Sequence, residues 1–123
     1  METVLLVDDE EIVVGVGKQM LEKLGFAVLT ATSREEALDI YRDNKGKIGL
    51  VVLDMVMPGM GAGDTYDELL SIDPAAKVLL SSGYGVDQQT SEVLNRGCRG
   101  FIQKPFNMRS LSEKIGEILK MPD

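Results

Sequence analysis

Short apolar runs and longer amphipathic segments alternate along this chain, and that alternation restricts the possible fold more than any other feature. Five times, an apolar run of strand length is followed by a segment whose apolar residues recur at helical spacing. The expected strands are 3–7, 26–31, 48–54, 77–82 and 101–103. Strands that alternate with helices form parallel sheets through right-handed crossovers. The sequence therefore predicts an α/β domain with helices on both faces of a parallel sheet.

The run 48–54 is the most apolar of these strands and is expected at the centre of the sheet. Turn-forming residues bound it on both sides, and it ends on the carboxylate of Asp54. A continuous apolar run is typical of a strand buried on both faces. Ligands of open parallel sheets bind beyond the carboxyl ends of the strands, which is where Asp54 would lie.

Glycines mark the ends of two expected helices. Gly25 ends the first, and Gly97 ends a weak helix predicted over 86–96. Gly15 and Gly17 lie inside the first helix and weaken it by about 1 kcal/mol each relative to Ala. Helical spacing assigns the apolar stripe of the first helix to Ile12, Val13, Val16, Met20, Leu21 and Leu24.

Composition narrows the class of protein. A chain of 123 residues suits one domain, and a hydrophobic content of 44% is typical of a folded core. No run approaches the about 20 apolar residues of a membrane-spanning helix. The amino end has no signal-peptide pattern, and the single Cys98 cannot form an internal disulfide. These features favour a cytoplasmic domain without membrane contact.

Charge and histidine content exclude several functions. The net charge of −7 disfavours direct nucleic-acid binding. The chain has no His, which excludes a Ser-His-Asp triad, a His-ligated zinc site and a phosphohistidine intermediate within the chain itself.

Polar side chains follow four of the expected strands. Asp8 and Asp9 follow the first, Asp54 ends the third, Ser82 ends the fourth and Lys104 follows the fifth. Parallel strands end at one edge, so these groups should converge there. Closely spaced carboxylates require a cation, and carboxylate oxygens select a hard ion such as Mg²⁺. Mg²⁺, a lysine and a hydroxyl can hold phosphoryl oxygens, and a carboxylate in line with them can form an aspartyl phosphate.

Each of these groups alone has an ordinary structural explanation. Asp8 and Asp9 could favour the dipole of a helix first turn, Ser82 could open a turn, and Lys104 could form a surface corner. Their joint occurrence at successive strand ends favours the phosphoryl site, with Asp54 as the nucleophile and Asp8 and Asp9 as metal ligands.

These motifs resemble the receiver domain of two-component signalling, which accepts a phosphoryl group from a histidine kinase. The matching motifs are Asp8-Asp9, Asp54 with Met57-Pro58-Gly59, Ser82-Gly83 and Lys104-Pro105-Phe106. The resemblance extends from Thr3 to about Met121, so residues 1–123 are expected to form a single receiver domain. It implies a flavodoxin-like (βα)5 doubly wound sheet with strand order 2-1-3-4-5.

The resemblance also implies a metal site. Asp54 would be the phosphoacceptor and a ligand of Mg²⁺. Asp9 would be a direct ligand, Asp8 a ligand acting mainly through water, and the Val56 carbonyl a further one. Mg²⁺ is the expected cofactor.

A set of switch residues follows from the same resemblance. The Ser82 hydroxyl would follow the phosphoryl group, Lys104 would pair with it, and Phe101 would be the aromatic switch residue. The Lys104–Pro105 peptide would be cis. Two positions depart from the family pattern: Ala62 replaces the usual Gly in the loop after Asp54, and Phe101 lacks the hydroxyl of the more common Tyr.

The implied function is a signalling module that accepts a phosphoryl group on Asp54 and changes conformation to regulate a partner or an attached domain. It would catalyse its own phosphorylation and dephosphorylation. The expected partner is a histidine kinase transmitter or a histidine phosphotransfer domain, and weak homodimers are also expected. The stretch 57–84 is similar to receivers fused behind sensor histidine kinases, which favours a hybrid kinase as the source.

Two other functions fit the sequence less well. A phosphohydrolase of the haloacid-dehalogenase type also uses an aspartyl phosphate, but it carries a second acid two residues after the nucleophile, where this chain has Val56. An unphosphorylated protein-binding domain would not require the full set of acids.

Overall fold

The computed structural model describes residues 2–57, 61–83 and 85–120. Strands and helices alternate throughout these ranges, as the sequence predicts. The elements are β1 (Thr3–Val7), α1 (Glu11–Lys23), β2 (Ala27–Ala31), α2 (Arg34–Asp43), β3 (Ile48–Asp54), α3 (Ala62–Ile72), β4 (Val78–Ser82), α4 (Gln88–Asn95), β5 (Gly100–Gln103) and α5 (Met108–Leu119).

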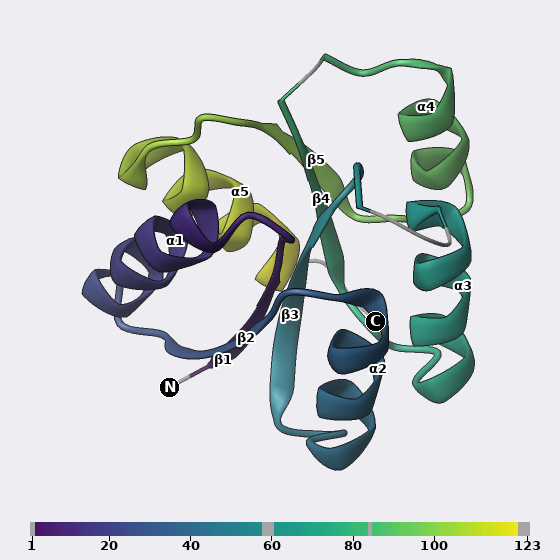
Figure 1. Ribbon diagram of the computed structural model, residues 1–123, viewed down its shortest axis with the longest axis horizontal. Coiled ribbons are helices and arrows are strands. Elements are labelled where there is room, and N and C mark those ends of the chain that lie inside the picture. The colour runs from purple at the N-terminus through teal and green to yellow at the C-terminus, as the bar shows by residue number, and fades with distance from the viewer. Residues whose placement is uncertain (1, 58–60, 84, 121–123) are drawn as a thin grey trace.

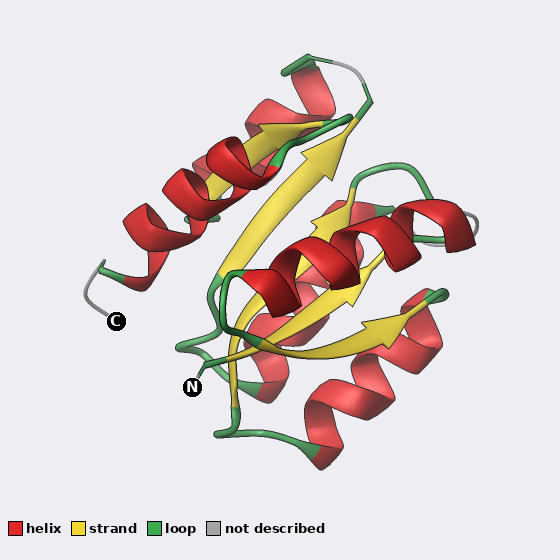
Figure 2. Ribbon diagram, turned by 90° about the vertical axis from the view of Figure 1, so that its left-hand side faces the viewer, coloured by secondary structure: helices red, strands yellow, loops and turns green. Residues whose placement is uncertain are grey.

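The strands form one parallel sheet in the order β2-β1-β3-β4-β5. Helices α1 and α5 cover one face, and α2, α3 and α4 cover the other (Figures 1 and 2). The predicted flavodoxin-like fold is therefore confirmed. Strand β3 is central, and from Leu50 to Asp54 all of its residues are buried.

Each face of the sheet has its own hydrophobic cluster, because alternate strand residues point to opposite faces. One cluster joins the sheet to α2, α3 and α4 through residues that include Leu5, Val51, Leu53, Leu80, Tyr41, Leu69 and Val93. The other joins it to α1 and α5 through residues that include Val4, Leu6, Val52, Leu79, Leu21, Leu111, Ile115 and Ile118.

The predicted apolar stripe of α1 is partly wrong. Ile12 and Val16 are 82% and 47% exposed, whereas the buried residues of α1 are Val14, Gly17 and Leu21. Gly17 lies against the sheet, since a Cβ there would come within 2.8 Å of a Leu6 methyl group. A hydrophobic pattern counts apolar side chains and ignores glycine, so it placed the buried face of α1 too far toward Ile12 and Val16.

Element boundaries differ slightly from the predictions. β2 and β4 each begin one residue later than predicted, at Ala27 and Val78, and β5 begins one residue earlier, at Gly100. Helix α4 is shorter than the predicted 86–96, because the Asp87 side chain accepts a hydrogen bond from the Thr90 amide (2.9 Å) and caps the helix start.

The glycines predicted to end helices do so. Gly25 and Gly97 have positive φ angles of 98° and 109°, a conformation that glycine adopts without steric cost. None of the helices in the described ranges has the length and apolar character needed to cross a bilayer.

Candidate phosphoacceptor site

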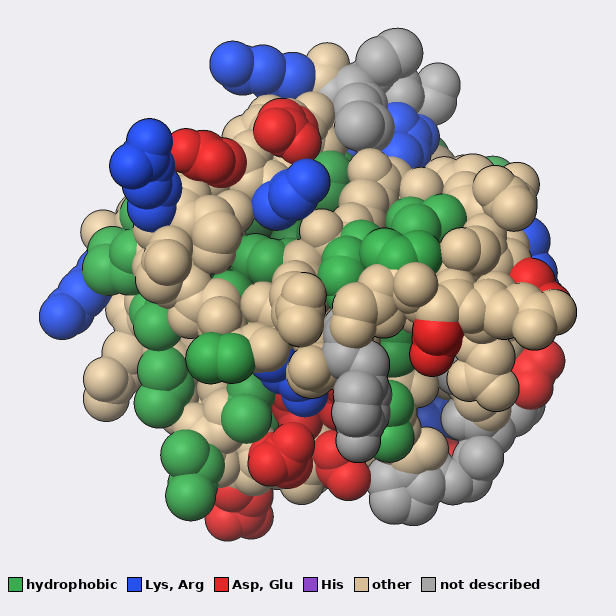
Figure 3. Space-filling view, turned by 90° about the horizontal axis from the view of Figure 1, so that it is seen from above, with side chains coloured by type: hydrophobic (Ala, Val, Ile, Leu, Met, Phe, Trp, Pro, Cys, Tyr) green, Lys and Arg blue, Asp and Glu red, His purple; other side chains and the backbone are tan. Residues whose placement is uncertain are grey.

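Strand register aligns the predicted polar residues along the carboxyl edge of the sheet. Val7 pairs with Leu53, so Asp8, the residue after β1, lies at the same level as Asp54, the last residue of β3. Asp54 pairs with Ser81 across β3 and β4, and Ser82 pairs with Gln103, the residue before Lys104. Figure 3 views the molecule from this edge, where acidic side chains gather beside a partly covered basic one.

Lys104 links the two buried carboxylates of the site. Its Nζ donates to Asp8 Oδ2 (3.0 Å) and to Asp54 Oδ1 (3.3 Å). The side chains of Asp8 and Asp54 are each 2% exposed, and that of Lys104 is 14% exposed. Burying carboxylates is costly unless they are paired. Lys104 supplies the pairing, but one ammonium faces two carboxylates.

Backbone amides provide further hydrogen bonds to these carboxylates. The Glu10 amide donates to Asp8 Oδ1 (3.0 Å), and the Val56 amide donates to Asp54 Oδ1 (3.2 Å). Each carboxylate is thus held by the amide of the second residue after it.

The electrostatics of the site raise the pKa of Asp54 from 3.8 to about 6. Burial is the main cause, and the charge of Asp8 adds to it, while the Val56 amide and Lys104 act in the opposite direction. Burial alone would lower the pKa of Lys104, but its bond to Asp8 and the charges of both carboxylates outweigh burial and raise it. Lys104 therefore remains a fixed positive charge at neutral pH.

A group of acidic oxygens beside the buried pair suits a divalent cation. Asp8, Asp9 and Glu10 each place one carboxylate oxygen within 4.8 Å of the others. Oxygen ligands without His or Cys nearby are the donor set that Mg²⁺ prefers. Asp8 belongs to both groups, so the cation site and the Lys104 site are continuous. The residues present fit the metal that the sequence predicts.

Glu10 is a residue of the site to which the sequence analysis gave no role. Its carboxylate lies 3.9 Å from Lys104 Nζ and is largely exposed at the edge of the site. It directly follows Asp8-Asp9 in an acidic run, and that run is the signal that could have indicated it.

The predicted switch residues lie on the adjoining strands. Ser82 is buried at the end of β4, and its carbonyl accepts a hydrogen bond from the Lys104 amide (2.7 Å). Phe101 is half-buried in β5 and packs against the hydrophobic cluster under α2, α3 and α4. The Lys104–Pro105 peptide is cis, as predicted.

An open pocket of about 740 Å³ leads to the site. Asp54 and Lys104 line it together with residues of α1 and of the loops after β3 and β5. Its apolar lining consists of Ile12, Val13, Val16, Val56, Pro105 and Phe106. A buried carboxylate is thus reached from outside through a largely apolar entrance.

Comparison with known proteins decides the family. The family described as "Response regulator receiver domain" matches residues 4–116, which is most of the chain. The chain belongs to this family of receiver domains. The receiver domain is 36% identical over 121 residues to the sensor kinase CckA of Brucella abortus, covering 98% of this chain and 13% of that protein.

Other relatives have different lengths. The receiver domain is 33% identical over 118 residues to the chemotaxis protein CheY of Thermotoga maritima, covering 95% of this chain and 97% of that protein. The solved CheX–CheY complex with BeF3 and Mg²⁺ from Borrelia burgdorferi matches it with a TM-score of 0.90 and 28% identity, covering 98% of this chain and 90% of that chain. The match extends over nearly all of a free-standing protein, but over a small part of the kinase.

Proposed function

We propose that this receiver domain accepts a phosphoryl group on Asp54 from a phosphohistidine of a separate domain or chain. The main support is the position of Asp54: a buried carboxylate, 3.3 Å from Lys104, at the inner end of an open pocket. Its raised pKa indicates a desolvated and therefore more nucleophilic carboxylate. The phosphohydrolase alternative is not favoured, since the chain belongs to the receiver family.

The transfer is a displacement at phosphorus. A carboxylate oxygen of Asp54 forms an O–P bond as the P–N bond of the donor breaks, and the electron pair returns to the imidazole nitrogen. Asp8, Asp9, Asp54 and the Val56 carbonyl would hold Mg²⁺. When bound, Mg²⁺ neutralises the oxygens of the transferring group, as it does in other phosphoryl transfers.

Lys104 would stabilise the phosphorylated state relative to the unphosphorylated one. In the structure its ammonium is shared by Asp8 and Asp54. A phosphoryl group on Asp54 offers it new anionic oxygens, and the Ser82 hydroxyl at the end of β4 is a second donor to them. Because these contacts exist in one state alone, they shift the population toward that state, and Phe101 on β5 would move with them.

The entrance of the pocket would receive the phosphodonor. Ile12 and Val56 are exposed apolar residues, and Phe106 lines the same wall. A donor must cover this wall while its phosphohistidine reaches Asp54. A helix with an apolar face fits, and basic side chains beside its histidine would complement Asp9 and Glu10 at the rim.

The wider context is also a proposal. We propose that residues 1–123 form a single cytoplasmic receiver that binds neither nucleic acid nor membrane and that forms weak homodimers. The net charge of −7 supports the absence of nucleic-acid binding. The similarity to the sensor kinase CckA supports a histidine kinase transmitter or phosphotransfer domain as donor, and a hybrid kinase as the source. Sequencing the reading frame beyond both ends tests this: an upstream kinase domain is expected, and a downstream helix-turn-helix would contradict it.

Mass spectrometry tests the central proposal. The domain is incubated with Mg²⁺ and acetyl phosphate, with and without a chelator. We expect a gain of one phosphoryl group that disappears in Asp54→Asn and in the chelated sample, because without a cation the incoming oxygens would face an acidic cluster. Unchanged uptake in the Asp54→Asn variant would show that the acceptor lies elsewhere.

A further inference from the structure

Among the elements that the structure describes, helix α4 makes its most extensive contacts with α3. The two helices lie next to each other on the same face of the sheet (Figure 1). Within α4 the buried residues are Thr90 and Val93. An open cavity of about 200 Å³ lies at the surface between α3 and α4. Polar contacts across this seam therefore help to set where α4 lies.

Arg96, the C-cap residue of α4, makes a polar bridge across this seam. Its Nη1 donates to the Gly63 carbonyl (3.2 Å) and to Asp67 Oδ2 (3.1 Å). Gly63 and Asp67 are four residues apart in α3 and so lie on the same face of that helix. The bridge holds the end of α4 against the first two turns of α3.

Gly63 is the residue that gives Arg96 room. A Cβ at this position would lie 2.9 Å from Arg96 Nη1 and 3.5 Å from a Val93 methyl group. The guanidinium of Arg96 therefore occupies the space that a side chain at this position would fill. A movement of the first turn of α3 would change the hydrogen bond that Arg96 donates to the Gly63 carbonyl.

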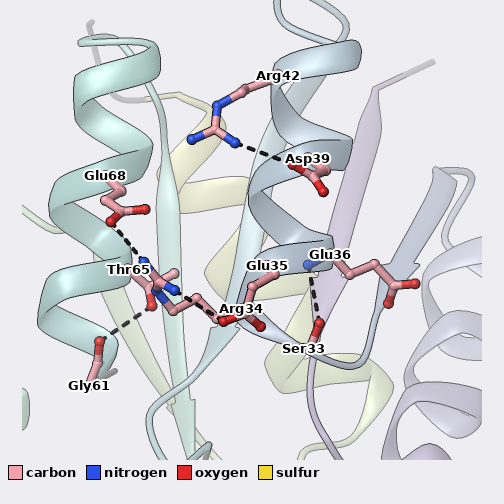
Figure 4. A network of polar contacts seen from close by, with 9 residues as sticks. All are labelled: Ser33, Arg34, Glu35, Glu36, Asp39, Arg42, Gly61, Thr65 and Glu68. Atoms are coloured by element: carbon pink, nitrogen blue, oxygen red, sulfur yellow. Dashed lines mark hydrogen bonds and ion pairs between the residues drawn. The ribbon is translucent and has the colours of Figure 1, made fainter. Parts of the chain in front are cut away.

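The first turn of α3 is also connected to the phosphoacceptor loop. It follows, along the chain, the loop that begins after Asp54 and includes the Val56 carbonyl. Met55, the next residue after Asp54, lines the cavity between α3 and α4 together with Gly63 and Arg96. On its other side α3 contacts α2 through the ion pair of Arg34 with Glu68 (2.8 Å; Figure 4). The residue after Asp54 thus reaches the same cavity as Gly63 and Arg96.

We propose that Arg96 is a positioning residue that couples helix α4 to the first turn of α3, and thereby to the loop that begins at Asp54. The coupling of α4 to phosphorylation rests on the proposed function, whereas the tether itself does not. Arg96 touches neither Asp54 nor Lys104 in the contacts above, so it would act through the position of Gly63.

Amide hydrogen exchange tests the tether without any phosphoryl group. Arg96→Met should accelerate exchange in α4 by about fivefold, which is the factor for a loss of about 1 kcal/mol from a partly exposed ion pair. Gly63→Ala should act in the same direction but more weakly, because its Cβ requires only the flexible end of the Arg96 side chain to shift. The matched control is Arg42→Met, since Arg42 pairs with Asp39 within α2 (Figure 4). Exchange in α4 that is equal in Arg96→Met and in the control would overturn the proposal.

Amide spectra recorded with Mg²⁺ and beryllofluoride, a phosphoryl mimic, then test the coupling. We expect shifts at Val56 and Gly83 in every variant, and shifts across α4 that fall by half or more in Arg96→Met and by less in Gly63→Ala. Undiminished α4 shifts in those variants, or none in the unmodified protein, would overturn the coupling. Absent shifts at Val56 and Gly83 would instead count against the proposed function, and the exchange experiment would still decide the tether.

Discussion

Replacing Asp54 by Asn should stabilise the domain in a pH-dependent manner. The pKa of Asp54 is raised from 3.8 to about 6, so between these values the folded state binds more protons than the unfolded state. Stability then falls as the pH rises through this window, and above it the ionised Asp54 destabilises the fold by about 3 kcal/mol, at about 1.4 kcal/mol per pKa unit. Asn cannot ionise and avoids this loss.

The assay is urea unfolding followed by circular dichroism at pH 4 and at pH 8, with a chelator present. We expect the stability difference between Asp54→Asn and the unmodified protein to be about 2–3 kcal/mol larger at pH 8 than at pH 4. Because the stability difference is compared between two pH values, any pH-independent effect of the substitution cancels. The raised pKa of Lys104 does not interfere, since the stability it adds is present at both pH values and is lost at higher pH.

Asp43→Asn provides the control for this experiment. Asp43 is an exposed carboxylate at the end of α2, so its replacement shows the effect of removing a carboxylate that is not buried. If the effect of Asp54→Asn were the same at pH 4 and pH 8, the argument that burial and Asp8 destabilise the ionised Asp54 would be refuted. Adding Mg²⁺ at pH 8 should narrow the gap, because the cation would bind the unmodified site more tightly.

Four further variants test other parts of the structure. Lys104→Ala should keep the fold but reduce the amide shifts caused by beryllofluoride, and undiminished shifts would contradict its role. Val56→Asn combined with Tyr84→Glu should shorten the lifetime of the phosphoryl group, since Val56 cannot orient a water; Tyr84 lies outside the described residues, and an unchanged lifetime would refute this. Gly17→Ala should destabilise the domain by roughly 1–3 kcal/mol through overpacking against β1. Gly15→Ala, where the space is open, should stabilise it by up to about 1 kcal/mol, and equal unfolding midpoints would contradict both.

The sequence was sufficient to predict the fold and the convergence at the sheet edge. Alternating strands and helices leave few topologies open, and in a parallel sheet all strands end at the same edge. The convergence of Asp8, Asp54 and Lys104 could therefore be predicted from the sequence alone. Their burial and the sharing of one ammonium between two carboxylates depend on side-chain packing, which only the structure shows.

Features that depend on the close approach of a helix to a strand or to another helix were missed. The phase of α1 is set by Gly17, which has no side chain for a hydrophobic pattern to count. The bridge of Arg96 to Gly63 joins residues 33 positions apart, and nothing in either local sequence indicates the other. In both cases a glycine marks the place where another group comes close, and only the tertiary structure identifies that group.

The charge imbalance at the site connects stability with signalling. Asp8 and Asp54 are buried against one lysine, and Asp9 and Glu10 add negative charge at the rim. A second buried lysine would relieve the repulsion and stabilise the fold, but a cation would then gain little by binding. Because the repulsion is left unrelieved, a divalent ion would gain free energy there, and on the proposed function Lys104 would exchange its carboxylate partners for a phosphoryl group. The same imbalance that lowers the stability of the folded state would then make the site responsive to phosphorylation.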